Sequence, residues 1–233
     1  MGKLMINDTE CSGFGSKIYL TSGSSGGIQF ETTELANNPT WAASLEFTLS
    51  GDYHDYDFVR FIVKRDGYGD YTTDIITTPD HIDKAFDLGS KFDLNEFGNN
   101  YYCCYTKNGA TWTKSGDRTI FITKIIGYIC TSHTVTETEI YSASARSSTA
   151  VSVDNQSDLL DYDLIFFSAN STRDDEVGPS IGVLNVNDEI ISKPASDCRQ
   201  VVFNGFNRNA SVFVTNTAIS SERFAYISGI KFV

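Results

Sequence analysis

The sequence lacks the features that would place it in a membrane or in a secretory pathway. No apolar run approaches the ~20 residues that a membrane helix needs, and residues 1–8 lack the apolar segment of a signal peptide. We therefore expect a chain that is made in a cytoplasm and does not insert into membranes. Only 4 prolines and no block of like charges argue against a disordered chain.

Basic side chains are scarce. The sequence has 18 Lys and Arg against 30 Asp and Glu, which gives a formal net charge of −12. Phosphate backbones and anionic lipid surfaces repel a chain of this charge. The composition therefore argues against nucleic acid as a partner.

Metal-binding and catalytic patterns are also missing. The five cysteines form no Cys-x-x-Cys pair, and the adjacent Cys103 and Cys104 point to opposite faces if they lie in a strand. The only histidines, His54, His81 and His133, have no paired spacing. We predict reduced cysteines, no metal, no cofactor and no enzymatic activity.

An internal repeat is the most informative feature that is present. Residues 55–64 read DYDFVRFIVK, and residues 161–170 read DYDLIFFSAN, 106 positions later (161 − 55). Near the end of each half, IIGY at 125–128 is matched by ISGI at 227–230. Glycine at the third place of both predicts a bulge or a close backbone contact. The chain is predicted to use one plan twice.

The alternation of apolar and polar residues predicts an all-β protein. In residues 44–50, for example, alternate positions are apolar, and turn signals recur about every 8–12 residues. Helical periodicity is confined to one turn over residues 78–86. We predict two tandem antiparallel β-sandwich domains, jelly-roll-like, preceded by an N-terminal β arm. The predicted boundaries are 1–40 for the arm, 41–131 for the first sandwich and 132–233 for the second.

The predicted arm holds two short strands, at 17–21 and 27–31. Two strands alone are marginally stable, so the arm must add to a neighbouring sheet or to another subunit.

One candidate ligand site is aromatic. Tyr68, Tyr71 and Trp112 could form a loop-borne platform for a sugar, because flat apolar rings with polar handles suit such ligands. The alternative is that these side chains belong to the core or to a strand surface.

Acidic residues suggest two further sites, each with a structural alternative. Asp66, Asp70 and Asp74 could supply oxygens to calcium, as could the charged run 173–176 (RDDE), but a plain turn or an exposed charged face explains each. Asp55 and Asp57 would share one strand face as an acid–base pair. Their recurrence as Asp161 and Asp163 favours hydrogen bonding in turns or caps, because two identical active sites would be odd.

The motifs also resemble a known family. YDFVRFIV, TTDIITTPDHI, FGNNYYCCYT, GATWT and RTIFITKIIGYI are similar to small β-sandwich modules of bacteriophage tail fibres and other virion appendages. The resemblance is closest over residues 45–130 and looser over residues 140–233. It implies a virion protein, often oligomeric and often at the host-contacting end. The sequence has no coiled-coil or glycine-repeat shaft, so tail-tip, baseplate and head-surface positions stay open.

The sequence therefore predicts a structural tail, fibre or baseplate protein of a bacteriophage, assembled in the host cytoplasm and involved in host attachment. Its expected partners are other virion proteins through the arm, further copies of itself in a trimer or ring, and a host surface glycan. A head-decorating or neck protein and a carbohydrate-binding module are the alternatives. A depolymerase has the least support.

Overall fold

The computed structural model describes fifteen segments of the chain, and every structural statement below concerns them. These segments are residues 5–6, 9–10, 28–37, 46–65, 72–88, 91–94, 103–115, 120–142, 150–152, 162–171, 176–184, 190–191, 203–207, 212–215 and 222–233. Strands make up most of the described residues, in largely antiparallel sheets with little helix. The predicted all-β class is confirmed.

Each half of the chain contributes four strands that pair in the same order. In the first half the order is β3–β10–β5–β6, with β3 (Phe30–Asn37), β10 (Ile120–Cys130), β5 (Phe58–Arg65) and β6 (Thr72–Thr77). In the second half it is β11–β18–β13–β14, with β11 (Val135–Ser142), β18 (Glu222–Phe232), β13 (Leu164–Ser171) and β14 (Glu176–Leu184). All of these pairings are antiparallel. The repeat in the sequence therefore reappears in the strand pairing.

The remaining strands repeat a second order. The first half has β4–β9–β8–β7, with β4 (Glu46–Thr48), β9 (Thr111–Ser115), β8 (Cys103–Asn108) and β7 (Lys91–Leu94). The second half has β12–β17–β16, with β12 (Ala150–Ser152), β17 (Val212–Thr215) and β16 (Phe203–Asn207). One parallel pairing, between β7 and the start of β14, links the two halves.

Three short strands lie outside this scheme. β1 (Met5–Ile6) pairs with β2 (Thr9–Glu10), and β15 (Ile190–Ile191) pairs with the end of β14. The predicted arm strand at 27–31 overlaps β3, which is an edge strand of the first half's own sheet; the other arm strand, 17–21, lies outside the described residues.

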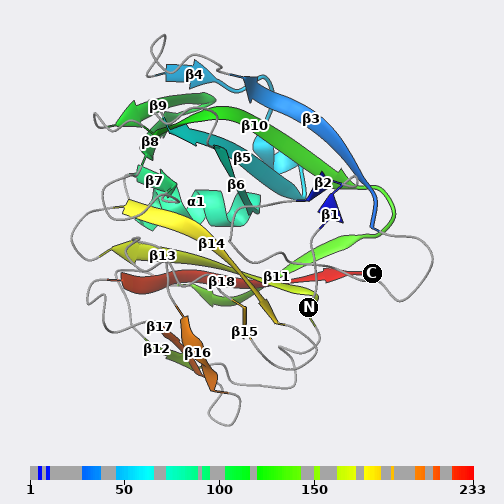
Figure 1. Ribbon diagram of the computed structural model, residues 1–233, viewed down its shortest axis with the longest axis vertical. Coiled ribbons are helices and arrows are strands. Elements are labelled where there is room, and N and C mark those ends of the chain that lie inside the picture. The colour runs from blue at the N-terminus through cyan, green and yellow to red at the C-terminus, as the bar shows by residue number, and fades with distance from the viewer. Residues whose placement is uncertain are drawn as a thin grey trace.

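Two short helices differ in detail from the sequence-based expectation. The predicted turn at 78–86 is a ten-residue helix, α1 (Pro79–Leu88). A 3₁₀ turn, η1 (Tyr53–Asp55), precedes β5, and β5 begins at Phe58. The expectation that Asp55 and Asp57 share a strand face is therefore wrong. In Figure 1, α1 lies between the sheet of the first half and the strands of the second. No helix in the described segments is long and apolar enough to cross a membrane.

The buried side chains form two clusters on opposite faces of β5. The first cluster lies entirely in the first half. It contains Val59, Phe61 and Val63 of β5, together with residues of β3, the segment 49–53, α1, β8, β9 and β10. Phe58 belongs to the second, which contains residues of both halves: Phe30, Phe58, Ile76 and Tyr128 with Leu164, Phe166 and Ile230. The alternation along β5 explains this division, since successive side chains point to opposite faces.

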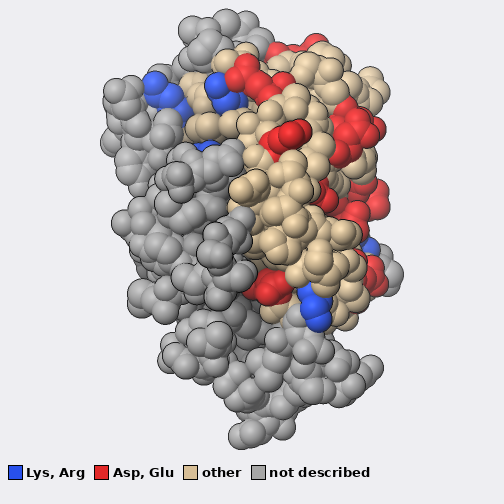
Figure 2. Space-filling model, turned by 90° about the vertical axis from the view of Figure 1, so that its right-hand side faces the viewer, with Lys and Arg blue, Asp and Glu red and all other residues tan. Residues whose placement is uncertain are grey.

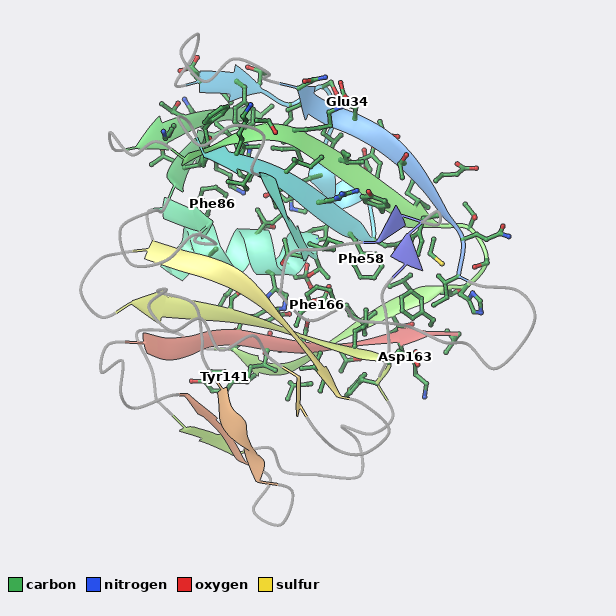
Figure 3. All side chains as sticks on the ribbon, in the orientation of Figure 1. Glu34, Phe58, Phe86, Tyr141, Asp163 and Phe166 are labelled. Atoms are coloured by element: carbon green, nitrogen blue, oxygen red, sulfur yellow. The ribbon has the colours of Figure 1, made fainter. Side chains whose placement is uncertain are left out.

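The second cluster joins equivalent positions of the two halves. Phe58 corresponds to Leu164 in the repeat, and Tyr128 corresponds to Ile230. The rings of Phe58 and Phe166 lie 6.0 Å apart between centroids, between the two sheets (Figure 3). The halves therefore meet through the same face of the same sheet, as the subunits of a two-fold symmetric dimer do.

Candidate functional site

The sequence-predicted site residues are only partly described. Trp112 has 1% of its surface exposed and lies in the first core cluster, with its ring near those of Phe47, Phe61 and Phe86. Such a ring cannot stack on an external sugar. Tyr68 and Tyr71 lie outside the described residues, so the sugar-binding prediction stays open for them.

The proposed calcium loops also lie largely outside the described residues. Asp66, Asp70 and residues 173–175 are not described, and Asp74 is placed only by its backbone in β6. No group of three or more His, Cys, Asp or Glu among the described side chains is arranged to hold a metal ion.

A repeated motif, which we term the Tyr–Asp clasp, precedes the central strand of each half. In the first half the ring of Tyr56 covers Gly127, and a Cβ on that glycine would overlap the ring. Asp57 donates its backbone N–H to the carbonyl of Tyr128 at 2.9 Å. Its carboxylate accepts the backbone N–H of Cys130 at 2.7 Å.

The second half builds the same clasp. Tyr162 covers Gly229 in the same way, and Asp163 donates its backbone N–H to the carbonyl of Ile230 at 2.8 Å. The Asp163 carboxylate accepts the backbone N–H of Phe232 at 2.8 Å. The predicted structural role of Asp57 and Asp163 is confirmed, as is the predicted close contact at both glycines.

A surface cluster joins η1 to α1 and β8. His54 lies between two carboxylates, with Nδ1 2.6 Å from Asp52 and Nε2 2.6 Å from Asp83. Lys107 donates to Asp83 at 2.9 Å and to the Tyr53 hydroxyl at 2.5 Å, and Tyr53 itself donates to Asp83. These contacts hold three elements of the first half together.

The groups in the surface cluster stabilise one another's charged forms. Partial burial by itself raises the pKa of Asp83, but the hydrogen bonds from Tyr53, His54 and Lys107 outweigh burial and lower it. Burial likewise opposes protonation of His54, yet the hydrogen bonds to Asp83 and Asp52 raise its pKa above the ordinary value. Figure 2 shows acidic side chains outnumbering basic ones on the described part of one face, in line with the net charge of −12.

A hydrogen-bond chain that is buried at His81 and part-buried at Glu137, which we term the junction chain, crosses from the first half to the second. His81 of α1 has no exposed surface; its Nδ1 lies 2.6 Å from Ser168 Oγ of β13, and its Nε2 lies 2.9 Å from Ser228 Oγ of β18. Ser228 donates onward to Glu137 Oε1 of β11 at 2.5 Å. Thr78, just before α1, donates to the same oxygen at 2.9 Å.

Burial sets the protonation of both titratable members. Complete burial lowers the pKa of His81 to about 3, because an imidazolium would lose its hydration. Burial also raises the pKa of Glu137 to about 7; Asp80 adds to the rise, and hydrogen bonds from Ser228 and Thr78 oppose it. Both groups are therefore held toward their uncharged forms.

The junction chain has the residue types of a Ser–His–acid triad without its geometry. In a triad the serine and the acid bind different nitrogens of the histidine. Here both nitrogens meet hydroxyls, and Glu137 Oε1 lies 3.9 Å from His81 Nε2, reached through Ser228. His81, Ser168 and Ser228 are all fully buried, so no substrate reaches them. The junction chain therefore connects the two halves and does not activate a nucleophile.

Sequence reasoning missed the junction chain, although the repeat carried a signal of it. Ser168 occupies the position of Ile62, and Ser228 occupies the position of Ile126. The second half thus has serine at two places where the first has isoleucine, and both serines bind His81. Where one half has a polar residue and the other has an apolar residue at the equivalent position, the polar residue makes a contact that its counterpart does not make.

Comparisons with protein-family models, with curated proteins and with solved structures find no match for this chain. The resemblance to virion appendage modules therefore stays a prediction.

Proposed function

We propose that this chain is a non-enzymatic structural component of a bacteriophage particle, a tail, fibre or baseplate protein that takes part in host attachment. The observation that carries the proposal is the use of its polar groups. In the two clasps, the surface cluster and the junction chain, the hydrogen bonds connect strands, helices or the two halves of the protein. Polar groups used in this way stabilise the fold, which suits a structural role.

The proposal includes two tandem antiparallel β-sandwiches, jelly-roll-like. The first core cluster supports this assignment, because its residues come from β5 and β10 of one sheet and from β8 and β9 of another. The repeated strand orders extend the assignment to the second half. Filled interiors of this kind suit a load-bearing module, and binding residues then belong on the connecting loops.

Proteomics of purified particles tests the proposal. Particles from cultures that carry this gene are separated into tails and heads, and peptides of the chain are quantified in each fraction. We expect them in the tail fraction at a copy number comparable with known structural proteins. Absence from particles contradicts a virion role, and enrichment with heads supports the head-decorating alternative instead.

Competition for adsorption tests the attachment part of the proposal separately. Purified protein added to host cells before infection is expected to slow particle adsorption in proportion to the receptors it occupies. Unchanged adsorption at saturating protein leaves a structural role without receptor contact.

A further inference from the structure

The junction chain connects the two halves through four elements. The imidazole comes from α1 of the first half, and the hydroxyls and carboxyl come from β13, β18 and β11 of the second. Tyr226 of β18 packs edge-on against His81, 4.6 Å between ring centroids. Separating the halves must break this chain and expose both titratable groups to water.

The hydrogen bonds of the junction chain can run in either donor-to-acceptor direction, and both directions fit an uncharged imidazole. If Glu137 is ionised, Ser228 donates its only proton to it, accepts from His81 Nε2, and leaves Nδ1 to accept from Ser168. If Glu137 carries a proton on Oε1 and donates it to Ser228, the bonds through Ser228, His81 and Ser168 reverse, and Thr78 still donates to Oε1. In both cases the imidazole carries one proton.

The surroundings of Glu137 fit an uncharged carboxyl. The titratable groups around Glu137 are Asp80 and His81 of α1 and Tyr226 of β18; Glu139 of the same strand acts on Tyr226. Within the described residues, no lysine or arginine lies within ion-pair distance of its carboxylate. The Glu137 side chain is 18% exposed, and a carboxylate mostly removed from water without a cation is disfavoured.

We propose that the junction chain is a proton-exchanging latch, in which opening the junction moves one proton from the Glu137 carboxyl to the His81 imidazole and closing moves it back. The closed form holds a neutral acid and a neutral imidazole; the open form holds a carboxylate and an imidazolium. The proton count is the same in both. This inference goes beyond the proposed function and does not rest on it.

The latch makes opening independent of pH over a definite window. Glu137 has a raised pKa in the closed form, so its contribution favours closing at low pH and is lost as pH rises. His81 has a lowered pKa, so its contribution favours closing at high pH and is lost as pH falls. Between the ordinary values of 4.5 for Glu and 6.5 for His the two contributions cancel.

Single substitutions in the full chain test the cancellation. Opening is measured by amide hydrogen exchange in α1 and β11 between pH 4.5 and 6.5, corrected for the intrinsic exchange rate. For the wild-type protein, the equilibrium constant for opening is expected to stay constant within about threefold over this pH range. Glu137→Gln is expected to open more at pH 4.5 than at pH 6.5, by roughly 30-fold, and His81→Gln to show the opposite trend of similar size.

A matched control separates the latch from a general charge effect. Glu31→Gln removes one carboxylate from an exposed position of β3, away from the junction chain, and is expected to follow wild type. The proposal is overturned if Glu137→Gln and wild type share one pH dependence, or if the trends of the two variants have the same sign.

A measurement on the wild-type protein guards against variants that fail to fold. The imidazole ¹⁵N resonances of His81 report its protonation directly and are expected to stay those of a neutral ring from pH 6.5 to 4.5. A titration of His81 within that range contradicts the latch, whatever the variants do.

Discussion

Replacing Gly127 by alanine is expected to lower the free energy of unfolding by about 2–4 kcal/mol. A Cβ at this position would overlap the Tyr56 ring, including the ring carbon closest to the backbone, so a small side-chain rotation does not relieve the clash. Gly229→Ala meets the ring of Tyr162 in the same way. Urea denaturation, with the same slope for variant and wild type, measures both losses.

Two controls sharpen this prediction. Gly51→Ala places its Cβ at an ordinary contact distance, 3.5 Å from Leu35, and is expected to change stability by less than about 0.5 kcal/mol. The double variant Tyr56→Ala with Gly127→Ala is expected to be less destabilised than the sum of the single variants, because the clash disappears with the ring. Additive losses would mean that the ring does not press on the glycine.

Replacing Trp112 by alanine is expected to cost about 3–5 kcal/mol of unfolding free energy. The indole is among the largest fully buried side chains, and it contacts aromatic rings from the segment before β5, from β5 itself and from α1. Its removal leaves a cavity that these neighbours fill only in part. Thermal and urea denaturation measure the loss.

Trp112→Phe serves as the matched variant, because it keeps an aromatic ring in the core. It is expected to lose less than half as much stability as the alanine variant. A small loss for alanine, together with loss of binding on a glycan array, would contradict the core assignment and restore the sugar-platform interpretation for this residue.

The sequence was sufficient for features that depend on neighbouring residues or on the repeat. Period-two alternation and turn residues predicted the all-β class, because the two faces of a strand meet different environments. The recurrence of Asp57 as Asp163 predicted a structural carboxylate, and glycine at matching places predicted a close contact. Each of these predictions compared one half with the other and needed no knowledge of distant partners.

Features that depend on distant partners were not predicted. The hydrogen-bond partners of His81, Ser168 and Ser228, lie 87 and 147 residues away along the sequence, so its local sequence does not identify them. The aromatic character of Trp112 fits a core as well as a binding surface, and only packing decides between them. The parallel pairing of β7 with β14 joins one half to the other and has no counterpart in the repeat.

Amide hydrogen exchange at Cys130 and Phe232 tests most directly the central claim that one structural plan is built twice. Each amide donates to the carboxylate of its own half's clasp, Asp57 or Asp163. We expect Asp57→Ala to speed exchange of the Cys130 amide by about tenfold or more and to leave Phe232 unchanged, and Asp163→Ala to do the reverse. Unchanged exchange at both amides, or equal acceleration of both in either variant, would contradict the claim.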